Sequence, residues 1–186
     1  KRTLGALSDV VSQYEINPEY KQINYKGAPQ KVSNLEYADF FRWLSNRANG
    51  IPGYVMVDPV NVTEAKYVKL DSPIKYSESA FFSEDLHRTL RMSYPTKIFN
   101  SYSFELDEAG NPYYVVSCMS PKVFMFGAMD VSEVIIFDPI SGNSAIYALE
   151  ETPSWVDNVF TGKGTYYYRN GDIYEGFWKN HHLSFL

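Results

Sequence analysis

The chain has almost no cysteine, since Cys118 is the only one among its 186 residues. One cysteine excludes an internal disulfide and the paired spacings of a cysteine-based zinc site. Such usage is compatible with a reducing cytosol, and equally with bacterial surface proteins that avoid cysteine. Cysteine chemistry is therefore limited to one free thiol.

Clusters of positive charge are also missing. Lys and Arg together number 17 against 22 Asp and Glu, which gives a net charge of −5, and no basic run occurs. Nucleic-acid binding requires clustered Lys and Arg to neutralise phosphates. We therefore expect no nucleic-acid partner.

Long apolar segments are absent as well. The apolar runs are only a few residues long, whereas a membrane-spanning helix needs roughly 20. No positively charged segment leads into the apolar region of a secretory signal. The chain opens on Lys1-Arg2-Thr3 without an initiating Met, so we expect a processed chain or a fragment, with any membrane anchor outside it.

Aromatic residues, by contrast, are abundant. They make up 17% of the chain, including 16 Tyr and 12 Phe, and hydrophobic residues make up 45%. A chain of this size and composition can bury a core. Aromatic side chains suit the half-buried faces of β-sheets, so we expect substantial sheet content.

A strand-turn-strand block occurs twice, at a constant spacing of 80 positions (138 − 58 = 80). Two shorter segments with Gly-x-Pro, Tyr25–Val32 and Glu108–Val115, also match, at an offset of 83. A repeat of this length usually reflects duplication of a folding unit; the alternative is a chance similarity of two hairpins. The matched pairs of the main block are Asp58 with Asp138, Pro59 with Pro139, Ala65 with Ala145, Tyr67 with Tyr147 and Pro73 with Pro153.

The repeated Asp-Pro pairs have two interpretations. Asp58 and Asp138 could be paired catalytic carboxylates. Each, however, precedes a proline at a strand end, where an Asp side chain typically caps the turn. Gly142 in the second turn tolerates positive φ. We therefore interpret Asp58, Pro59, Asp138, Pro139 and Gly142 as structural turn residues.

Hydrophobic periodicity predicts three helices and several strands. The helices are Thr3–Glu15, a segment capped by Asn34 and ended by Asn49-Gly50, and Glu84–Tyr94 capped by Ser83. The strands are Lys21–Tyr25, Gln30–Ser33, Gly53–Asp58, Glu64–Leu70, Tyr102–Leu106, Tyr113–Cys118, Val123–Phe126, Val134–Asp138 and Ser144–Ala148.

These elements predict an α+β fold made of two duplicated units, each a helix laid across an antiparallel sheet. The first unit covers residues 1–78 and the second covers residues 79–157. An aromatic-rich C-terminal β-hairpin follows over residues 158–186.

The second block, Ile135–Ile146, resembles the closing strands of PepSY-like domains, whose pattern is V-x-V-D-x-x-T-G-x-V. Asp138 and Gly142 stand at the matching places, whereas Val55–Tyr67 lacks the glycine. The whole chain is similar to the tandem extracytoplasmic portion of uncharacterised membrane-anchored proteins of Gram-positive bacteria. The resemblance implies a domain that binds or inhibits rather than catalyses.

The C-terminal segment Gly162–Lys179 (GKGTYYYRNGDIYEGFWK) is similar to a MORN repeat. That resemblance implies structural roles for Tyr174, Gly176 and Trp178. MORN arrays stack several copies, and one repeat alone is marginal. A local hairpin about Asn170-Gly171 is the simpler interpretation.

Several residues could carry chemistry, each with a plainer alternative. Cys118 and His87 could form a thiol nucleophile and its base, although Cys118 lies in an apolar strand. His181-His182 could join a metal site, but adjacent strand residues face opposite ways. Glu105, Asp107 and Glu108 lack the spacing of a calcium loop and are interpreted as a solvated turn. Gly162-x-Gly164 is too short to cradle a phosphate.

The leading functional hypothesis is therefore a non-enzymatic binding or regulatory domain on the extracytoplasmic face of a bacterial membrane. Its partner would be a protein, a peptide or a cell-wall component, with Tyr166, Tyr168 and Trp178 as a possible binding patch. No cofactor, metal or catalytic residue is expected. The alternatives are a Cys/His hydrolase, a MORN-type lipid- or protein-binding scaffold, and a cytoplasmic location.

Overall fold

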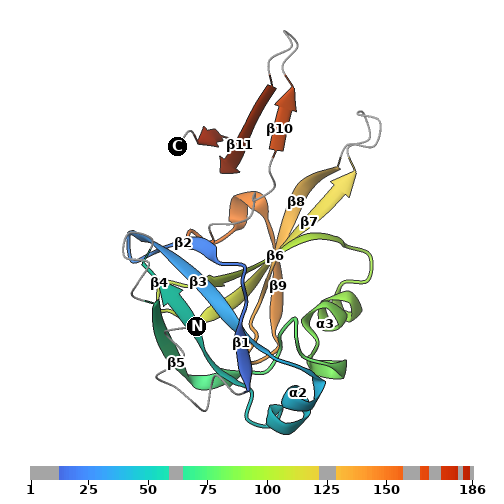
Figure 1. The fold of residues 1–186 in the computed structure, drawn as a ribbon. Coiled ribbons are helices and arrows are strands. Elements are labelled where there is room, and N and C mark those ends of the chain that lie inside the picture. Colours follow the sequence, from blue (N-terminus) through green and yellow to red (C-terminus); the bar gives the residue numbers. More distant parts are fainter. Residues whose placement is uncertain are drawn as a thin grey trace.

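A computed structural model describes residues 13–58, 65–121, 129–156, 164–167, 173–179 and 182–184. Two antiparallel sheets form the body of the molecule (Figure 1). The first contains β1 (Tyr14–Ile16), β2 (Lys21–Tyr25), β3 (Ala28–Tyr37), β4 (Ile51–Val57) and β5 (Ala65–Ile74). The second contains β6 (Ile98–Leu106), β7 (Pro112–Pro121), β8 (Met129–Phe137) and β9 (Ser144–Ala148).

Short helices and a separate hairpin complete the described chain. The α-helices are α2 (Phe40–Asn46) and α3 (Leu86–Ser93), and the 3₁₀ turns are η2 (Phe82–Glu84) and η3 (Leu149–Glu151). Both α-helices lie toward the same end of the molecule (Figure 1). Near the C-terminus, β10 (Gly164–Tyr167), β11 (Ile173–Lys179) and β12 (His182–Ser184) form a three-stranded antiparallel sheet.

The first sheet is organised around its longest central strand, β3. Both β1 and β2 pair with β3, whereas β4 pairs with β3 and β5. A two-residue turn joins β2 to β3, with φ of 53° at Lys26 and 77° at Gly27. Positive φ at both central residues is the turn that matches the twist of a hairpin. Local turn chemistry therefore sets the register of this pair.

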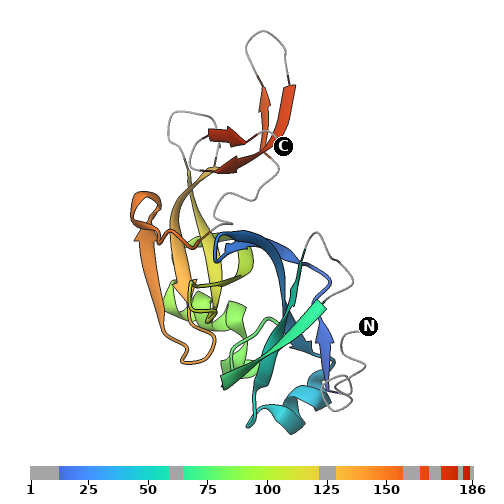
Figure 2. The same ribbon diagram turned by 90° about the vertical axis from the view of Figure 1, so that its left-hand side faces the viewer.

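The two sheets bury one common hydrophobic core. Inward-facing residues of the first sheet, such as Val32 and Tyr54, belong to the same cluster as Val116 and Ile135 of the second. The Tyr54 ring lies 6.1 Å from that of Phe104. Figure 2 shows the sheets on either side of this core. Each sheet thus covers a face of the other.

The second sheet is also buried on its outer face. Val115, Val134 and Ile136 form a smaller cluster there with Val156, and Trp155 packs against it. The Trp155 ring lies 5.1 Å from that of Tyr113. The segment after β9 therefore covers what would otherwise be an exposed apolar face.

The predicted α+β fold class was wrong, because the protein is mainly β. Its α-helices are only seven and eight residues long, and α2 fully buries a single side chain, Trp43. Such short helices cannot cover a sheet face, and the two sheets cover each other instead. The helices also stand at different places: α2 lies between β3 and β4, while α3 precedes β6. The two halves therefore do not repeat a unit made of one helix and one sheet. The division of the chain into three domains stays a prediction.

The order of strands does recur in the two halves. β2 to β5 and β6 to β9 are each antiparallel meanders, and the Asp-Pro blocks occupy the last strand pair of each. The registers differ by one residue, since Val57 pairs with Ala65 while Phe137 pairs with Ser144. Ala145, the counterpart of Ala65, therefore faces Ile136. Duplication itself stays a prediction.

Predicted strands agree with the structure better than predicted helices do. Ser144–Ala148 is strand β9 with the expected bounds, and the other predicted strands lie within or overlap β2 to β8, except Val123–Phe126, which falls outside the described residues. The predicted helix Thr3–Glu15 lies mostly outside them too, and Tyr14–Ile16 is strand.

Both internal helices start later than predicted. Asn34 lies in β3, and Asp39 caps α2 through a 2.9 Å bond from the Arg42 amide. Asp85 caps α3 in place of Ser83, accepting the Arg88 amide at 2.8 Å. Neither α2 nor α3 has the length and apolar character of a membrane-spanning helix, and the described residues contain no other candidate.

Candidate functional site

A cleft of about 430 Å³ opens between the two sheets. The interruption between β1 and β2, strand β3, strand β6 and the segment before η2 all contribute to it. Its polar lining comes from residues far apart in sequence: Asn17, Glu19, Lys21, Asn34, Glu36, Glu78, Asn100, Ser101 and Tyr102. We call this site the inter-sheet cleft.

The cleft exists because the edge strand beside β3 is interrupted. Between β1 and β2 the chain leaves the regular ladder at Asn17-Pro18, and a proline has no amide hydrogen to continue the pairing. Side-chain and main-chain bonds hold the interruption in place. The Asn17 amide donates to the Asn34 carbonyl at 3.1 Å, and the Ser33 hydroxyl donates to the Asn17 carbonyl at 2.7 Å.

Glu36 is the central acidic group of the inter-sheet cleft. Its Oε1 accepts a 2.8 Å bond from Asn17 Nδ2 and a longer 3.4 Å contact from Asn34 Nδ2. Burial raises the pKa of Glu36, and repulsion from Glu78 raises it further, while the two amides lower it. Among the described residues Glu36 has no ion-pair partner. Lys21 also lines the cleft, but its ammonium pairs with Glu19 at 3.5 Å. Among the described residues the half-buried Glu36 carboxyl is thus held by amides and forms no salt bridge.

Asn34 links this carboxyl to the hydrophobic core. It is almost fully buried, and its Nδ2 also donates to the Tyr114 hydroxyl at 3.2 Å. Tyr114 is itself fully buried, and its pKa is raised mainly by that burial. The bottom of the cleft is therefore a rigid polar chain that runs from Glu36 to Tyr114.

On the other wall, Glu78 and Tyr102 line the cleft, and His87 contacts both of them. His87 Nε2 lies 3.5 Å from a Glu78 carboxylate oxygen, and this contact raises the pKa of His87. The His87 ring lies edge-on to Tyr102, with centroids 4.3 Å apart. Burial raises the pKa of the Tyr102 hydroxyl to about 12. Tyr102 therefore stays a neutral hydrogen-bonding group at physiological pH.

Cys118 does not have the setting of an activated nucleophile. Its side chain is 0% exposed, and its thiol contacts the Val116 carbonyl at 4.0 Å. Burial raises the pKa of the thiol to about 11. Within the described residues it makes no hydrogen bond or ion pair with His87, which is bound to Glu78. Thiol catalysis requires an accessible thiolate, and this environment opposes one.

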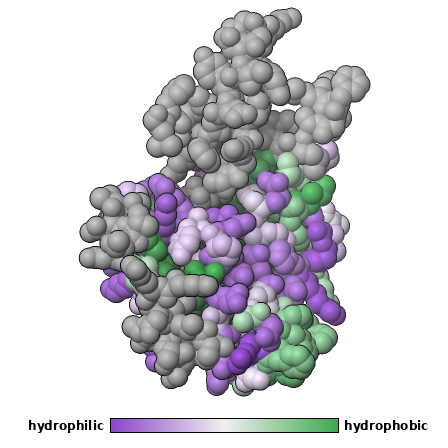
Figure 3. Space-filling view, in the orientation of Figure 1, coloured by the Kyte–Doolittle hydropathy of each residue, from purple (hydrophilic) through white to green (hydrophobic). Residues whose placement is uncertain are grey.

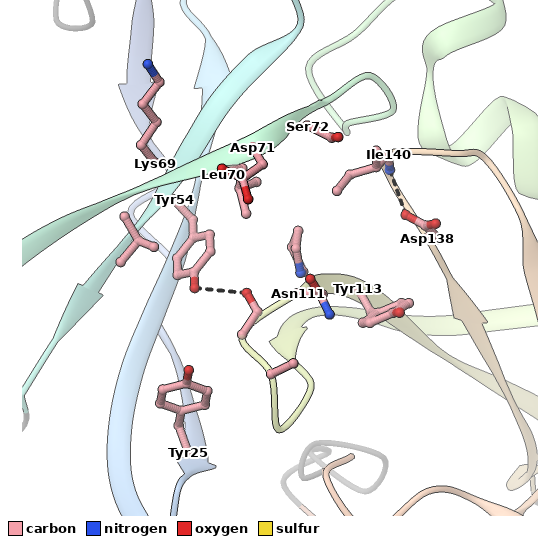
Figure 4. Close-up of a pocket in the computed structure, with 14 residues that line it drawn as sticks. Tyr25, Tyr54, Lys69, Leu70, Asp71, Ser72, Asn111, Tyr113, Asp138 and Ile140 are labelled. Carbon is pink, nitrogen blue, oxygen red and sulfur yellow. Dashed lines mark hydrogen bonds between the residues drawn. The ribbon is translucent and has the colours of Figure 1, made fainter.

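A second pocket, of about 440 Å³, lies between β5 and the β6–β7 and β8–β9 turns. Figure 4 shows Tyr25, Tyr54, Lys69 and Asn111 around it. Several of its polar groups are engaged: the Tyr54 hydroxyl donates to the Gly110 carbonyl at 3.1 Å, and Asn111 Nδ2 donates to Asp107 at 2.8 Å. The Tyr54 bond joins the two halves of the protein, whereas the Asn111 bond lies within the β6–β7 turn. We therefore interpret this pocket as a gap between packed turns rather than as a preformed ligand-binding site.

The turn at Asp138 also joins the halves. Asp138 Oδ1 accepts the Ile140 amide at 2.8 Å, and the Ser141 hydroxyl donates to Oδ2 at 2.5 Å. The Pro139 carbonyl accepts the amides of Lys75 and Tyr76 at 2.9 and 3.0 Å. Asp58 has a described position at the end of β4, but Pro59 lies outside the described residues. The structure thus holds Asp138 within a turn.

The three acids near residue 107 have different environments. Asp107 Oδ1 accepts the amides of Ala109 and Asn111 at 2.9 and 2.8 Å. Glu108 is exposed, but Glu105 is fully buried, so the prediction of a solvated turn was wrong for Glu105. In the described part of the chain, no group of three or more His, Cys, Asp or Glu side chains could hold a metal ion.

The C-terminal candidates are only partly described. Tyr166 pairs with Tyr174 across β10 and β11, Gly164 pairs with Gly176, and Trp178 pairs with Leu183. Of the remaining candidates, His182 pairs with Lys179 at the start of β12. Gly162, Tyr168 and His181 lie outside the described residues. The possible binding patch and the MORN interpretation stay predictions.

Sequence reasoning missed Glu36 and Glu78 and assigned Asn34 to a helix cap. No local pattern marks these residues, because the inter-sheet cleft assembles them from separate strands and a loop. Asn17-Pro18 was the one available signal, since Asn-Pro interrupts regular structure.

Comparisons with known proteins found no match to this chain. No family model matches the chain, and neither a curated protein nor a solved structure does.

Proposed function

We propose that the protein is a non-enzymatic binding module whose ligand enters the inter-sheet cleft. The carrying observation is the environment of Glu36: a half-buried carboxyl, oriented by Asn17 and Asn34 and without a cationic partner among the described residues. Pockets with a few convergent polar groups are the usual form of a ligand site. A ligand that donates hydrogen bonds from a protonated amine would compensate this carboxyl.

The proposed ligand is a peptide or cell-wall component with a free amino group. Tyr102 offers a ring and a neutral hydroxyl beside the carboxyls, and Ser101 and Asn100 offer further polar contacts. The module would act on the extracytoplasmic side of a bacterial membrane, in agreement with the PepSY-like sequence pattern. The rigid chain from Glu36 to Tyr114 supports a preformed site, which lowers the entropic cost of binding.

Matched peptides test this proposal. A short peptide with one free lysine and the same peptide acetylated on the lysine amine would be titrated into ¹⁵N-labelled protein. We expect the free lysine peptide alone to shift the amide signals of Asn34, Ser101 and Tyr102, and Glu36→Gln to abolish the shifts. Glu108→Gln is the control, because Glu108 is exposed and does not line the cleft. Equal shifts with both peptides, or none, would contradict the proposal.

A Cys/His hydrolase remains the alternative from another class, but the burial and raised pKa of Cys118 favour binding over thiol catalysis. A broad esterase and peptidase screen that detects activity lost in Cys118→Ser and His87→Gln would reverse this preference. The MORN-type scaffold predicts instead that Trp178→Ala abolishes binding to a partner or to lipid.

A further inference from the structure

A histidine and a glutamate form an ion pair beside the inter-sheet cleft. His87 Nε2 lies 3.5 Å from Glu78 Oε2, and the two side chains are 47% and 32% exposed. Glu78 lines the cleft, whereas His87 contacts it from α3. Figure 3, in the orientation of Figure 1, shows mostly hydrophilic surface around the place of α3. The pair is therefore open to water and can exchange protons with it.

The fold sets the geometry of this pair. The Ser77 carbonyl accepts the Leu86 amide at 3.1 Å, so the residues that follow them, Glu78 and His87, start from fixed neighbouring positions. Leu86 is 0% exposed and anchors the start of α3 in the core. From β6, the Tyr102 ring lies edge-on to the imidazole, with centroids 4.3 Å apart. Glu78 and His87 thus meet through tied segments rather than as two free surface side chains.

The groups around His87 determine when it carries a charge. The contact with Glu78 raises the pKa of His87 most, partial burial lowers it, and Asp85 at the start of α3 raises it further. Tyr102 is neutral, because burial raises its pKa to about 12. Two more groups act on Tyr102, from β7 and from α3: Cys118 and Arg91. The pKa of His87 is thus raised above the ordinary histidine value, and its charge changes in the physiological range.

The charge on His87 sets the charge that the cleft presents to an amine. While His87 is protonated, its positive charge offsets the Glu78 carboxylate, and Glu36 alone attracts a cation. Once His87 is neutral, both carboxylates in the cleft lining attract it. The remaining charged lining residues, Lys21 and Glu19, pair with each other at 3.5 Å and add no net charge. An added unit charge this close changes the affinity for a cation about fivefold at a partly solvated site.

We propose that the Glu78–His87 pair makes the inter-sheet cleft pH-sensitive: the cleft binds an amine weakly while His87 is protonated and more tightly once His87 is neutral. This inference rests on the proposed function, since it concerns the regulation of the same cleft. Affinity should therefore rise as pH rises through the titration of His87. Coupling between two sites is reciprocal, so a bound amine should in turn lower the pKa of His87.

Calorimetric titration of the full chain with a peptide tests this proposal. The peptide is acetylated at its N-terminus and has one free lysine, whose amine stays charged between about pH 6 and pH 8.5. We expect the association constant to rise about fivefold over this range, and His87→Gln to lose the rise. The control is His181→Gln combined with His182→Gln, because these are the only other histidines of the chain. A purely structural role for His87 would change the affinity equally at every pH.

Nuclear magnetic resonance of the His87 ring adds a measurement on the wild-type chain. Saturating peptide should lower the pKa of His87 by the logarithm of the factor by which affinity rises. Without peptide, Glu78→Gln should also lower the pKa of His87, because it removes the negative charge that favours the protonated ring.

The contrary results separate this inference from the proposed function. No peptide binding at any pH would overturn both. Binding of equal strength across the range, or a rise that persists in His87→Gln, would overturn the pH sensitivity and leave the binding site in place. A pKa of His87 that neither the peptide nor Glu78→Gln changes would do the same.

Discussion

Gly142 lies directly against the ring of Tyr76, so closely that a Cβ on Gly142 would be 2.7 Å from three of its atoms. Tyr76 belongs to the segment after the first sheet, and Gly142 to the β8–β9 turn of the second. The Tyr76 amide also donates to the Pro139 carbonyl at 3.0 Å. This contact joins the two halves of the protein, and it explains why the second Asp-Pro turn contains a glycine that the first lacks.

Gly142→Ala should destabilise the protein more than Gly27→Ala does. Both glycines have positive φ, 81° and 77°, so both variants incur a backbone cost of about 1–2 kcal/mol. Only at Gly142 does the new methyl group meet a ring, because a Cβ on Gly27 would have no neighbour within 4 Å. We expect a further loss of about 1–3 kcal/mol at Gly142, measured by urea denaturation. Equal losses would show that Tyr76 moves aside freely.

Lys26→Asn should stabilise the β2–β3 hairpin. Lys26 has a φ of 53° in a two-residue turn before Gly27, and Asn-Gly is the favoured sequence for such a turn. We expect a gain of about 0.5–1 kcal/mol in the free energy of unfolding. Lys26→Ala is the control, because it removes the same charge and ring contact with Tyr25 without favouring positive φ. A similar gain in both variants would assign the effect to charge.

Glu36→Gln should change how stability depends on pH. The pKa of Glu36 is raised in the folded protein, mainly by burial, so the folded state binds a proton more tightly than the unfolded state does. The free energy of unfolding should therefore fall as pH rises from the ordinary glutamate value through the raised one. The variant should lose this fall, relative to wild type and to Glu108→Gln, in thermal melts across acidic pH. An unchanged profile would contradict the environment described for Glu36.

Cys118 should resist alkylation in the folded protein. Its thiol is buried, and its pKa is raised to about 11, whereas an unperturbed thiol reacts readily at about pH 8. We expect iodoacetamide to label it only after denaturation, as mass spectrometry would show. Cys118→Ser should cost about 1–3 kcal/mol in stability, because it places a hydroxyl in an apolar site. Rapid labelling of the native chain would revive the hydrolase alternative.

The sequence by itself determined the local β-structure. Alternating apolar residues and turn residues predicted the strand pairs, including Ser144–Ala148 with its observed bounds. These elements form from neighbouring residues, so their signals are contiguous in sequence. Helix starts were less well determined, because Asn34 and Asp39 are both good capping residues and the pairing of β3 with β4 decided between them.

Only the tertiary structure decided which side chains are buried and which stay exposed. Phe41 and Leu44 are large apolar residues of α2, but the helix is short and buries Trp43, so both of these side chains stay exposed. The inter-sheet cleft likewise brings Glu36 of β3 beside Glu78 and Tyr102, which no spacing rule connects. Burial and close approach between distant segments depend on how two sheets pack, and that is a property of the whole chain rather than of any short stretch of it.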